Sequence, residues 1–447
     1  MEKLDQKDIM TRKDISFKIV TLGCKVNQYE SAYLNEALVQ AGCHHAIDGE
    51  KADVTIVNTC IVTVKAAHQS RQEIRKAYRG SKKGMVAAIG CYAQVYPDEL
   101  SAINGVGLIA GNTEKRQIPE LVMNTMRSGQ KSVVLKEFIP EAPFDFLPIR
   151  HFPGRSRAYL KIQDGCRSFC SYCIVPFARG PYRSLSLEKV LHMLETLSNE
   201  GYKEIVLTGI HLGKYGIDLE GDIKLNGLLR AIGKEKFPIR IRLSSIEPDE
   251  IDEELIEMVA SEKWLCRHFH LSLQNGDNRT LKRMNRNYTV QDFIKLIESI
   301  HLKIPLAAVG VDIMAGFPGE DVKAHENTFS LINDLPISYL HVFPFSSRPG
   351  TAASTFKGQI DPGVIKKRAK ELRSLGKKKE TVFYRGCLKK EFEVLVEGWH
   401  SKEEKVVNGV SDNYLTVFFI SSKDLRGKLV PVRMERLEKN RMIGSAL

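Results

Sequence analysis

The chain has 447 residues, of which 43% are hydrophobic and 27% are charged. This balance is typical of globular domains and excludes a wholly disordered protein, and the length predicts about three domains. Lysine and arginine number 66 against 54 aspartate and glutamate residues, which gives a net charge of +12. The excess of positive charge favours a polyanionic partner, of which nucleic acid is the first candidate. The alternative is that this charge only keeps the protein soluble.

No stretch of the sequence approaches the roughly 18–20 apolar residues that a membrane helix needs. Residues 1–14 lack the apolar run of a signal peptide. We therefore expect a cytoplasmic protein with no membrane partner. In a reducing compartment, the nine cysteines favour metal ligation or catalysis over disulfides.

The N-terminal part of the chain alternates strand and helix patterns. Apolar runs predict strands at 17–23, 54–58 and 85–90, and the stretches between them predict helices at about 28–41, with Asn27 as N-cap, and at 64–79. This βαβαβ order predicts an α/β domain with a parallel sheet and right-handed crossovers, which we place at residues 15–140.

Residues 141–153 contain three prolines and little periodicity, so we interpret them as a linker. A second domain follows at residues 154–380, where strand patterns recur with helical stretches between them. The six strands are expected near residues 157–163, 204–208, 239–244, 268–273, 307–313 and 338–344. Six β/α units of this length predict an open, partial (β/α)6 barrel, with its chemistry at the carboxyl ends of the strands.

The last part of the chain differs in character. Residues 361–390 contain eleven basic and three acidic side chains, and their apolar spacing is compatible with a helix. This segment is either a phosphate-binding surface or simply a solvated helix face. Four or five short strand patterns follow in under sixty residues. They predict a small all-β barrel of the oligonucleotide-binding type, in a domain of residues 381–447.

Three closely spaced cysteines follow the first strand of the second domain. Cys166, Cys170 and Cys173 have the spacing Cys-x3-Cys-x2-Cys in DGCRSFCSYCIVPFARG (164–180). A structural zinc site normally takes four ligands, and no fourth Cys or His lies close by in the sequence. Three thiolates instead suit three irons of a [4Fe-4S] cluster whose fourth iron is open. We predict such a cluster, against the alternative of three coincidental thiols.

Three more cysteines end the predicted N-terminal strands. Cys24 follows the first strand (TLGCK), Cys60 the second (VNTC) and Cys91 the third (AIGCY). Because the carboxyl ends of parallel neighbours meet at one edge of a sheet, we expect these thiols to converge. Structural cysteines would more naturally lie at strand centres. We therefore predict a second iron–sulfur cluster, with buried structural thiols as the alternative.

At the loop from Cys166 to Cys173, the sequence resembles the radical S-adenosylmethionine (SAM) superfamily. The resemblance implies that SAM binds the open iron and is cleaved by an electron from the reduced cluster. It further implies that the 5′-deoxyadenosyl radical so formed abstracts hydrogen from an unactivated carbon. Tyr172 matches the position whose side chain contacts adenine in this superfamily, with packing of the loop as the alternative.

Taken together, TLGCKVNQYE, VNTCIVT, IGCYAQ and the Cys166 loop resemble the methylthiotransferase family over nearly the full chain. The resemblance implies two [4Fe-4S] clusters, two SAM molecules per turnover and a C-terminal RNA-binding barrel called a TRAM domain. Segments 244–248, 273–289 and 341–351 look like the branch that modifies N6-threonylcarbamoyladenosine (t6A) at tRNA position 37. The alternatives are the same chemistry on i6A at position 37 or on a ribosomal-protein aspartate, or a metal-stabilised RNA-binding protein without catalysis.

The resemblance also implies SAM contacts at strand ends of the second domain. LTGIHLG (207–213) stands where the superfamily has a Gly-rich motif, which makes Thr208 and Gly209 candidate contacts of the methionine amino group. Ser244 and Gln274 are candidate contacts of the ribose or carboxylate. Each is alternatively an ordinary turn or strand-end residue.

The implied partners are a tRNA anticodon stem-loop carrying t6A37, an electron donor and a sulfur source. Arg283 and Arg286 are candidate RNA contacts, with solvated helix charges as the alternative. Nothing in the sequence demands an oligomer, so we expect a monomer. The barrel aromatics either stack on bases or fill the core: Trp399, Tyr414, Phe418 and Phe419. We interpret the remaining thiols as structural and three histidines as packed or solvated: Cys43, Cys266, Cys387, His211, His268 and His270.

Overall fold

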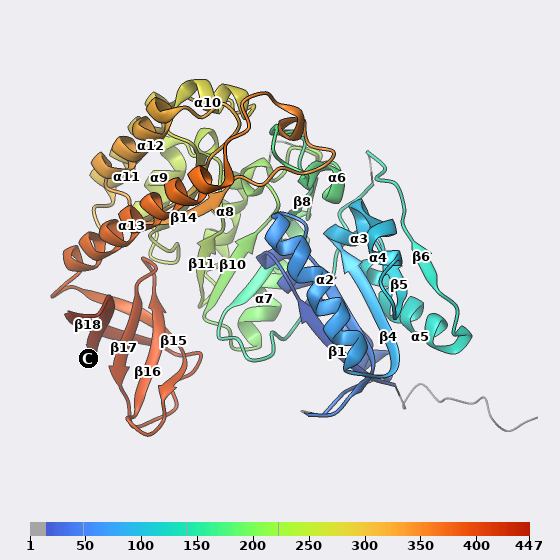
Figure 1. Cartoon of the computed structure of the whole chain (residues 1–447). Coiled ribbons are helices and arrows are strands. Elements are labelled where there is room, and N and C mark those ends of the chain that lie inside the picture. The colour runs from blue at the N-terminus through green and yellow to red at the C-terminus, as the bar shows by residue number, and fades with distance from the viewer. Residues whose placement is uncertain (1–14, 48, 141, 222) are drawn as a thin grey trace, which may run out of the picture. The chain divides into compact units, whose positions relative to one another are not determined.

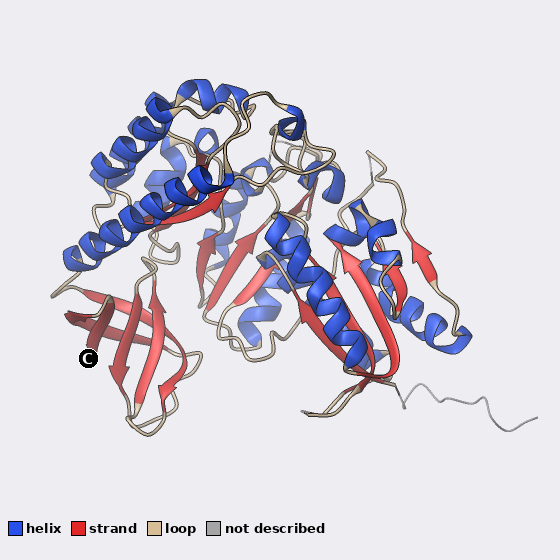
Figure 2. Cartoon of the chain, in the orientation of Figure 1, coloured by secondary structure: helices blue, strands red, loops and turns tan. Residues whose placement is uncertain are grey.

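The structure is a computed structural model that describes residues 15–47, 49–140, 142–221 and 223–447. Residues 1–14, where we expect no signal peptide, lie outside this range. The chain divides into two compact units (Figures 1 and 2). The first contains the described residues up to 151 with 165–167 and 174–181, and the second contains the rest. In the described part of the chain, no helix combines the length and apolarity needed to cross a membrane.

The first unit is built on a six-stranded parallel sheet. Its strands are β1 (Ser16–Thr21), β2 (His44–His45), β3 (Ala52–Thr59), β4 (Ser81–Gly90), β5 (Val106–Ala110) and β6 (Ser132–Val134). They lie in the order β2-β1-β3-β4-β5-β6, and every pairing is parallel. Its helices are α1 (Lys25–Gln40), α2 (Val64–Arg79), α3 (Cys91–Val95), α4 (Pro97–Ser101), α5 (Ile118–Ser128) and α6 (Val175–Arg179).

Helices cover both faces of this sheet. On one face, α1 and α5 pack on the strands, with Leu34 against Ile56 in the same core. On the other face, α2, α3 and α4 do so, with Ile74 and Val57 in a second core. The chain therefore changes face between β1 and β3. In such sheets, ligands bind in the crevice at this change of face, outside the carboxyl ends of the strands.

The predicted strands and helices of this unit are confirmed, with two differences. β2, β5 and β6 extend the sheet, and strands of two to five residues carry too short a periodic signal to be predicted. The prediction of Asn27 as N-cap is wrong, because α1 begins at Lys25 with Cys24 as its N-cap. Asn27 is buried in the first turn and donates from its side-chain amide to the carbonyl of Leu22 at 2.7 Å and that of Thr59 at 3.0 Å.

The second unit begins with six parallel strands that follow one another in chain order. They are β7 (Ala158–Lys161), β10 (Glu204–Thr208), β11 (Arg240–Leu243), β12 (His268–Gln274), β13 (Ala308–Ala315) and β14 (Tyr339–Pro344). Two three-stranded sheets, β11-β10-β7 and β12-β13-β14, are joined by a parallel bridge between Ile246 and Leu271. Among the described residues β7 and β14 do not pair, so the predicted open, partial (β/α)6 barrel is confirmed.

Helices alternate with these strands (Figure 2). They are α7 (Leu187–Asn199), α8 (Leu225–Glu235), α9 (Glu253–Ser261), α10 (Asn278–Arg283), α11 (Val290–Lys303), α12 (Val322–Asp334) and α13 (Pro362–Gly386). A short antiparallel pair, β8 (Gln163–Asp164) with β9 (Arg183–Ser184), brackets the cysteine loop and is not predicted from the sequence.

The C-terminal strands close into the predicted all-β barrel. They are β15 (Glu391–Ser401), β16 (Val406–Ser411), β17 (Thr416–Ile420), β18 (Leu429–Glu438) and β19 (Arg441–Ala446), in the order β15-β16-β17-β19-β18. Val394, Val417 and Met434 are fully buried in its core. The expected domain boundary at residue 380 falls within α13, which continues to Gly386.

A buried ion cluster joins the two barrels of the second unit. The fully buried carboxylate of Glu204 accepts hydrogen bonds from Arg240 at 2.7 Å and Arg242 at 2.8 Å. The same arginines donate to the C-terminal barrel, Arg240 to the carbonyl of Val410 and Arg242 to that of Ser411. Burial alone would raise the pKa of Glu204, but Arg242 and Arg240 outweigh it and lower this pKa to about 2. One carboxylate thus holds the two cations that fix the barrels to each other.

We expect Glu204→Gln to destabilise the second unit by about 3–5 kcal/mol, because it leaves buried arginines without their counter-charge. Both tryptophans of the chain, Trp264 and Trp399, lie in this unit, so urea unfolding followed by tryptophan fluorescence measures the change. The matched control is Glu254→Gln, which removes an exposed partner of Arg230 and is expected to cost no more than about 1 kcal/mol. Equal effects of the two substitutions would contradict the buried-ion interpretation.

The lowered pKa of Glu204 predicts that the stability of the second unit depends on pH. Its folded-state pKa of about 2 lies below the ordinary value of 4.5, so its stabilising contribution is fully present above about pH 4.5. That contribution is lost as the pH falls from 4.5 toward 2. Over this window, the free energy of unfolding of the second unit should decrease less steeply for Glu204→Gln than for the wild type.

Candidate functional site

The register of the N-terminal sheet brings three cysteines to one edge. Thr21 of β1 pairs with Asn58 of β3, and Asn58 pairs with Ile89 of β4. The cysteines follow these three positions by three, two and two residues: Cys24, Cys60 and Cys91. The structure therefore places the predicted N-terminal triad at the carboxyl ends of three adjacent strands, and two of its members flank the crevice between β1 and β3.

The three thiols lie close enough to influence one another. A Cβ atom on Gly23 would lie 2.8 Å from the Sγ atom of Cys60, so only glycine lets the turn before Cys24 pass that thiol. Burial raises the pKa of Cys60 to about 12, and the neighbouring Cys91 and Cys24 contribute to the rise. Cys60 and Cys91 are buried, whereas Cys24 is exposed.

A buried charge cluster lies beside Cys91. The fully buried guanidinium of Arg179 donates to the Cys91 Sγ atom at 3.2 Å. It also donates to Glu30 at 2.5 Å and to the side-chain oxygen of Asn27 at 2.6 Å. Lys115, equally buried, pairs with Glu30 at 3.3 Å. Two cations against one carboxylate leave positive charge beside the thiols, which suits an anionic group bound there.

The spacing of this triad does not suit a single metal ion. Two thiolates on one zinc ion lie roughly 3.8 Å apart, since the Zn–S distance is about 2.3 Å. Among the described residues, the Sγ atoms of Cys24, Cys60 and Cys91 do not all lie within 4.8 Å of one another. A [4Fe-4S] cluster instead holds each thiolate on a separate iron. The three thiols and the adjacent cations therefore fit such a cluster.

The second triad lies in the loop between β8 and α6. A Cβ atom on Gly165 would lie 1.7 Å from the carbonyl oxygen of Pro181, so this turn requires glycine. Within the second unit, Ser171 anchors the loop: its amide donates to the carbonyl of Met284 at 3.0 Å and its hydroxyl to that of Arg283 at 2.8 Å. The three thiols remain partly exposed: Cys166, Cys170 and Cys173. An anchored loop with accessible thiols fits a cluster that must also bind a substrate.

Tyr172 packs in a small apolar cluster. Its ring meets that of Phe317 edge-on at a centroid distance of 6.4 Å, next to Met284 and Phe345. Burial raises the pKa of Tyr172 well above its ordinary value. Packing alone explains this position, so adenine contact by Tyr172 stays a prediction.

The two predicted RNA-contacting arginines are engaged within the second unit. Arg286 is 5% exposed, pairs with Glu247 at 2.9 Å and donates to the Sγ atom of Cys170 at 3.5 Å. Arg283 lies over the ring of Phe356, 5.3 Å from its centroid. The placement of Arg286 favours holding the cysteine loop over contacting RNA, and RNA contact by either arginine stays a prediction.

Apart from Tyr172, the predicted SAM contacts lie at carboxyl ends of barrel strands. Thr208 ends β10, Gly209 follows it, and Ser244 follows β11 at the level of Thr208. The Ser244 hydroxyl is buried and has no hydrogen-bond partner in the part of the chain that is described, a state that a polar ligand would relieve. Gln274 ends β12 with a φ of +68°, a strained backbone for this residue type. These features fit a ligand at this end of the barrel.

The basic segment forms a largely solvated face of α13 and the residues that follow it. Of its eleven basic side chains, nine are exposed. Arg368 instead pairs with Glu320 at 2.8 Å in the interior, and Lys379 donates to the carbonyl of Leu335 at 2.6 Å. Most of this charge is therefore available to solvent or to an anionic partner.

The barrel aromatics divide between core and surface. Phe419 is 2% exposed and Trp399 packs against the same core. Phe418 is half-buried under the guanidinium of Arg441, 5.3 Å from its ring centroid, and beside His400 at 4.9 Å. Of these aromatics, Phe418 has the surroundings that suit base stacking.

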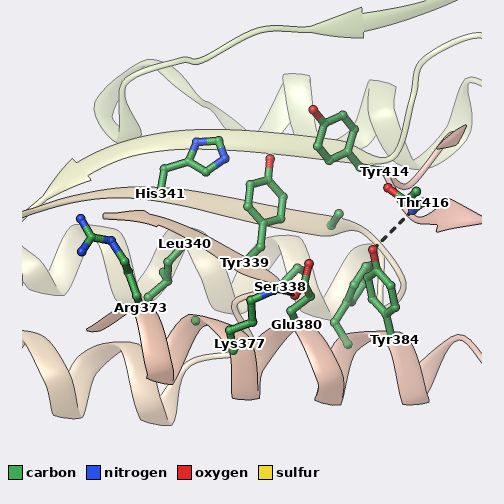
Figure 3. Close-up of a pocket in the computed structure, with 13 residues that line it drawn as sticks. Ser338, Tyr339, Leu340, His341, Arg373, Lys377, Glu380, Tyr384, Tyr414 and Thr416 are labelled. Atoms are coloured by element: carbon green, nitrogen blue, oxygen red, sulfur yellow. Dashed lines mark hydrogen bonds and ion pairs between the residues drawn. The ribbon is translucent and has the colours of Figure 1, made fainter. Parts of the chain in front are cut away.

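A cavity of about 370 Å³ lies between β14, α13 and the C-terminal barrel (Figure 3). Tyr339 and His341 rise from one side of β14, whereas Arg373 and Lys377 project from α13. Tyr414 of the barrel stacks on Tyr339 at 5.7 Å. Aromatic rings opposite cationic side chains suit a nucleotide, although the sequence alone does not predict this cavity.

Three polar clusters are not predicted from the sequence. They form around Arg179, around Glu204, and around Asp312 with two histidines, His270 and His341. Each cluster joins residues that lie tens of residues apart on different elements. A single sequence shows no sign of such pairings, and the nearest signal is that Arg179 lies in the motif that contains Cys173.

Family profiles and a solved structure define the class of protein. A profile of the radical SAM superfamily matches residues 160–332, and a profile described as uncharacterized protein family UPF0004 matches residues 16–111. The radical SAM methyltransferase TsrM from Kitasatospora setae, with tryptophan and a SAM analogue bound, has a similar fold, with a TM-score of 0.57. The two are 15% identical, and the match covers 76% of this chain and 74% of that one. The fold and the cysteine loop are those of a radical SAM protein.

Relatives of nearly full length narrow this class. The threonylcarbamoyladenosine tRNA methylthiotransferase MtaB of Aquifex aeolicus is 38% identical over 92% of this chain and 98% of its own length. MtaB of Bacillus subtilis is 36% identical, over 93% and 92%. The tRNA-2-methylthio-N(6)-dimethylallyladenosine synthase of Natranaerobius thermophilus is 31% identical, over 94% of each chain. The chain belongs to the radical SAM methylthiotransferase family, and membership implies a [4Fe-4S] cluster and SAM as cofactors.

We expect Arg179→Gln to loosen the first unit by about 1–3 kcal/mol, because buried hydrogen bonds to Glu30 and Cys91 are lost while Lys115 still balances the charge of Glu30. Hydrogen–deuterium exchange of peptides that cover β3 and β4 measures the loss of protection. Arg116→Gln is the matched control, since Arg116 is 62% exposed and its pair with Asp145 spans 3.9 Å. Unchanged exchange in Arg179→Gln would show that the buried cluster does not support the sheet.

Proposed function

We propose that this protein is a tRNA methylthiotransferase that converts t6A at position 37 to its 2-methylthio derivative. The observation that carries the proposal is the presence of two cysteine triads in one chain. One lies at the edge of the N-terminal sheet and the other in the radical SAM loop. The choice of t6A rests on the full-length relatives, since two MtaB proteins are 38% and 36% identical against 31% for a dimethylallyladenosine synthase.

In this proposal the loop triad holds the cluster that works with SAM. Cys166, Cys170 and Cys173 supply three thiolates, and the buried hydroxyl of Ser244 supplies a hydrogen-bonding group at the strand ends. Bound together, the cluster and SAM supply the reductive cleavage that activates an unreactive C–H bond. The chain contributes by anchoring the loop through Ser171 and by placing Arg286 against Cys170, which stabilises a thiolate there.

The N-terminal triad holds the second cluster, which carries the sulfur to be inserted. Cys24, Cys60 and Cys91 are its ligands, and the guanidinium of Arg179 stabilises negative charge on the Cys91 sulfur. Arg179 lies six residues after Cys173. The segment that carries the loop triad therefore leads directly to the arginine that contacts Cys91 of the N-terminal triad. Two SAM molecules serve each turnover, and an electron donor and a sulfur source are required as partners.

The RNA-binding role rests on charge and surface aromatics of the second unit. The exposed basic side chains near α13 neutralise phosphates, and the half-buried ring of Phe418 beside Arg441 offers a stacking platform. The cavity under Tyr339 and Tyr414 adds a place for one nucleotide of the anticodon stem-loop.

The substrate is tested by nucleoside analysis of tRNA from cells with and without the gene for this protein. We expect the 2-methylthio form of t6A to disappear on deletion, with unmodified t6A rising in its place. Loss of the methylthio form of i6A instead would identify the isopentenyl substrate. If neither nucleoside changes and no second enzyme makes them, the tRNA assignment is wrong.

The two triads are expected to have separable roles. Cys166→Ala, Cys170→Ala or Cys173→Ala should abolish reductive SAM cleavage in the anaerobically reconstituted protein. Cys24→Ala, Cys60→Ala or Cys91→Ala should retain cleavage to deoxyadenosine but give no methylthiolated RNA. Either set should lower the iron content from about eight to about four per chain, as expected for two [4Fe-4S] clusters.

Cys43→Ala is the control, because this buried thiol lies in the sheet core and belongs to neither triad. Loss of SAM cleavage in both sets would contradict the division of labour. Zinc in place of iron, with no deoxyadenosine formed, would favour a non-catalytic RNA-binding protein.

A further inference from the structure

The inner face of the partial barrel contains a cluster that neither cysteine triad uses. Along β12 and β13, residues facing the helices are buried, and the alternate residues that face the barrel interior are only partly buried. His270 and Asp312 are members of this inward row, at the middle of adjacent strands, and the register places His341 of β14 opposite Asp312. The three side chains therefore meet on one face of three consecutive strands.

The ligand atoms of these residues lie within reach of one another. The Nε2 atom of His270 is 2.9 Å from the Oδ1 atom of Asp312, and the Nδ1 atom of His341 is 3.3 Å from the same oxygen. One nitrogen or oxygen atom from each residue lies within 4.8 Å of the other two. Within the described part of the chain, no other group of three or more His, Cys, Asp or Glu residues meets this criterion.

These separations match the coordination sphere of one ion. Metal–ligand distances of about 2.0–2.2 Å and angles between octahedral and tetrahedral place neighbouring ligand atoms roughly 2.8–3.6 Å apart. Both measured distances fall in this range. Two histidines and one carboxylate, with further positions open, form a donor set that binds ferrous iron or zinc.

The surroundings add two features of a metal site. The Nδ1 atom of His270 lies 3.1 Å from the hydroxyl of Ser245, so a second-shell partner is present to fix the ring and leave Nε2 facing Asp312. His341 is 49% exposed and lines the cavity beside α13 (Figure 3). The half-exposed ring of His341 leaves an ion held by the three side chains accessible to water or to an anionic oxygen.

We propose that His270, Asp312 and His341 form a binding site for one divalent transition-metal ion, zinc or ferrous iron, separate from both cysteine triads. The carboxylate of Asp312 is the central ligand, and the two imidazoles bind through Nε2 of His270 and Nδ1 of His341. The site does not depend on the identity of the RNA substrate, so it stands or fails independently of the proposed function.

Zinc is the probe, because it binds nitrogen and oxygen ligands more tightly than ferrous iron does. The full chain is first reconstituted anaerobically so that the six cluster cysteines are occupied. It is then dialysed against buffered zinc, and metal per chain is counted by mass spectrometry. We expect about one zinc per wild-type chain, and affinity at least 100-fold weaker in His341→Ala. Ser245→Ala should weaken binding by about 10- to 100-fold, as other second-shell losses do.

His325→Ala is the matched control, since His325 pairs with the single carboxylate of Glu371 at 2.9 Å and has no second histidine. Because His341 is half-exposed, its replacement should leave iron content and thermal unfolding unchanged, and both are measured. Zinc uptake that survives in His341→Ala overturns the proposal. So does a wild type that takes up no zinc, which would show that the three side chains form only a hydrogen-bond network.

Discussion

The buried guanidinium of Arg179 is the contact on which the N-terminal site depends. It donates to a cysteine sulfur, a carboxylate and a side-chain amide at once, and a planar fork with five N–H groups is suited to do so. Glu30 neutralises part of its charge, and the remainder faces the thiol of Cys91. A site of this kind is preorganised for negative charge, because burying an unmatched cation is costly until an anion binds.

A similar buried ion cluster lies in the second unit, but there the central group is an anion and the surrounding groups are cations. There one carboxylate, Glu204, is surrounded by arginines that also satisfy backbone carbonyls of the C-terminal barrel. The two barrels therefore share polar contacts that neither could satisfy alone. Arg240 and Arg242 lie on one strand, β11, which ends next to Ser244. The strand that contacts the C-terminal barrel thus also leads to a residue proposed to contact SAM.

Much of the fold could be predicted from the sequence, because apolar runs and their spacing are local signals. The six barrel strands and strands β1, β3 and β4 of the N-terminal sheet lie where their patterns indicate, and the cysteines at their ends could be placed from that. Asn27 shows the limit: its position before a helical pattern favours a cap, but the helix starts earlier and its amide ties Leu22 to Thr59. Short strands and buried ion pairs such as Glu30 with Lys115 were beyond prediction, because they depend on contacts between distant segments.

The interleaved boundary between the two units has a consequence for modular use of the chain. Residues 174–181 belong to the first unit although 152–164 and 168–173 belong to the second. A fragment cut at residue 151 would keep all three N-terminal cysteines yet lack Arg179, leaving Glu30 with Lys115 alone. The N-terminal unit therefore cannot be moved to another protein as residues 1–151 alone. A circular permutant or chimera must also retain residues 174–181 to preserve the buried cluster around Arg179.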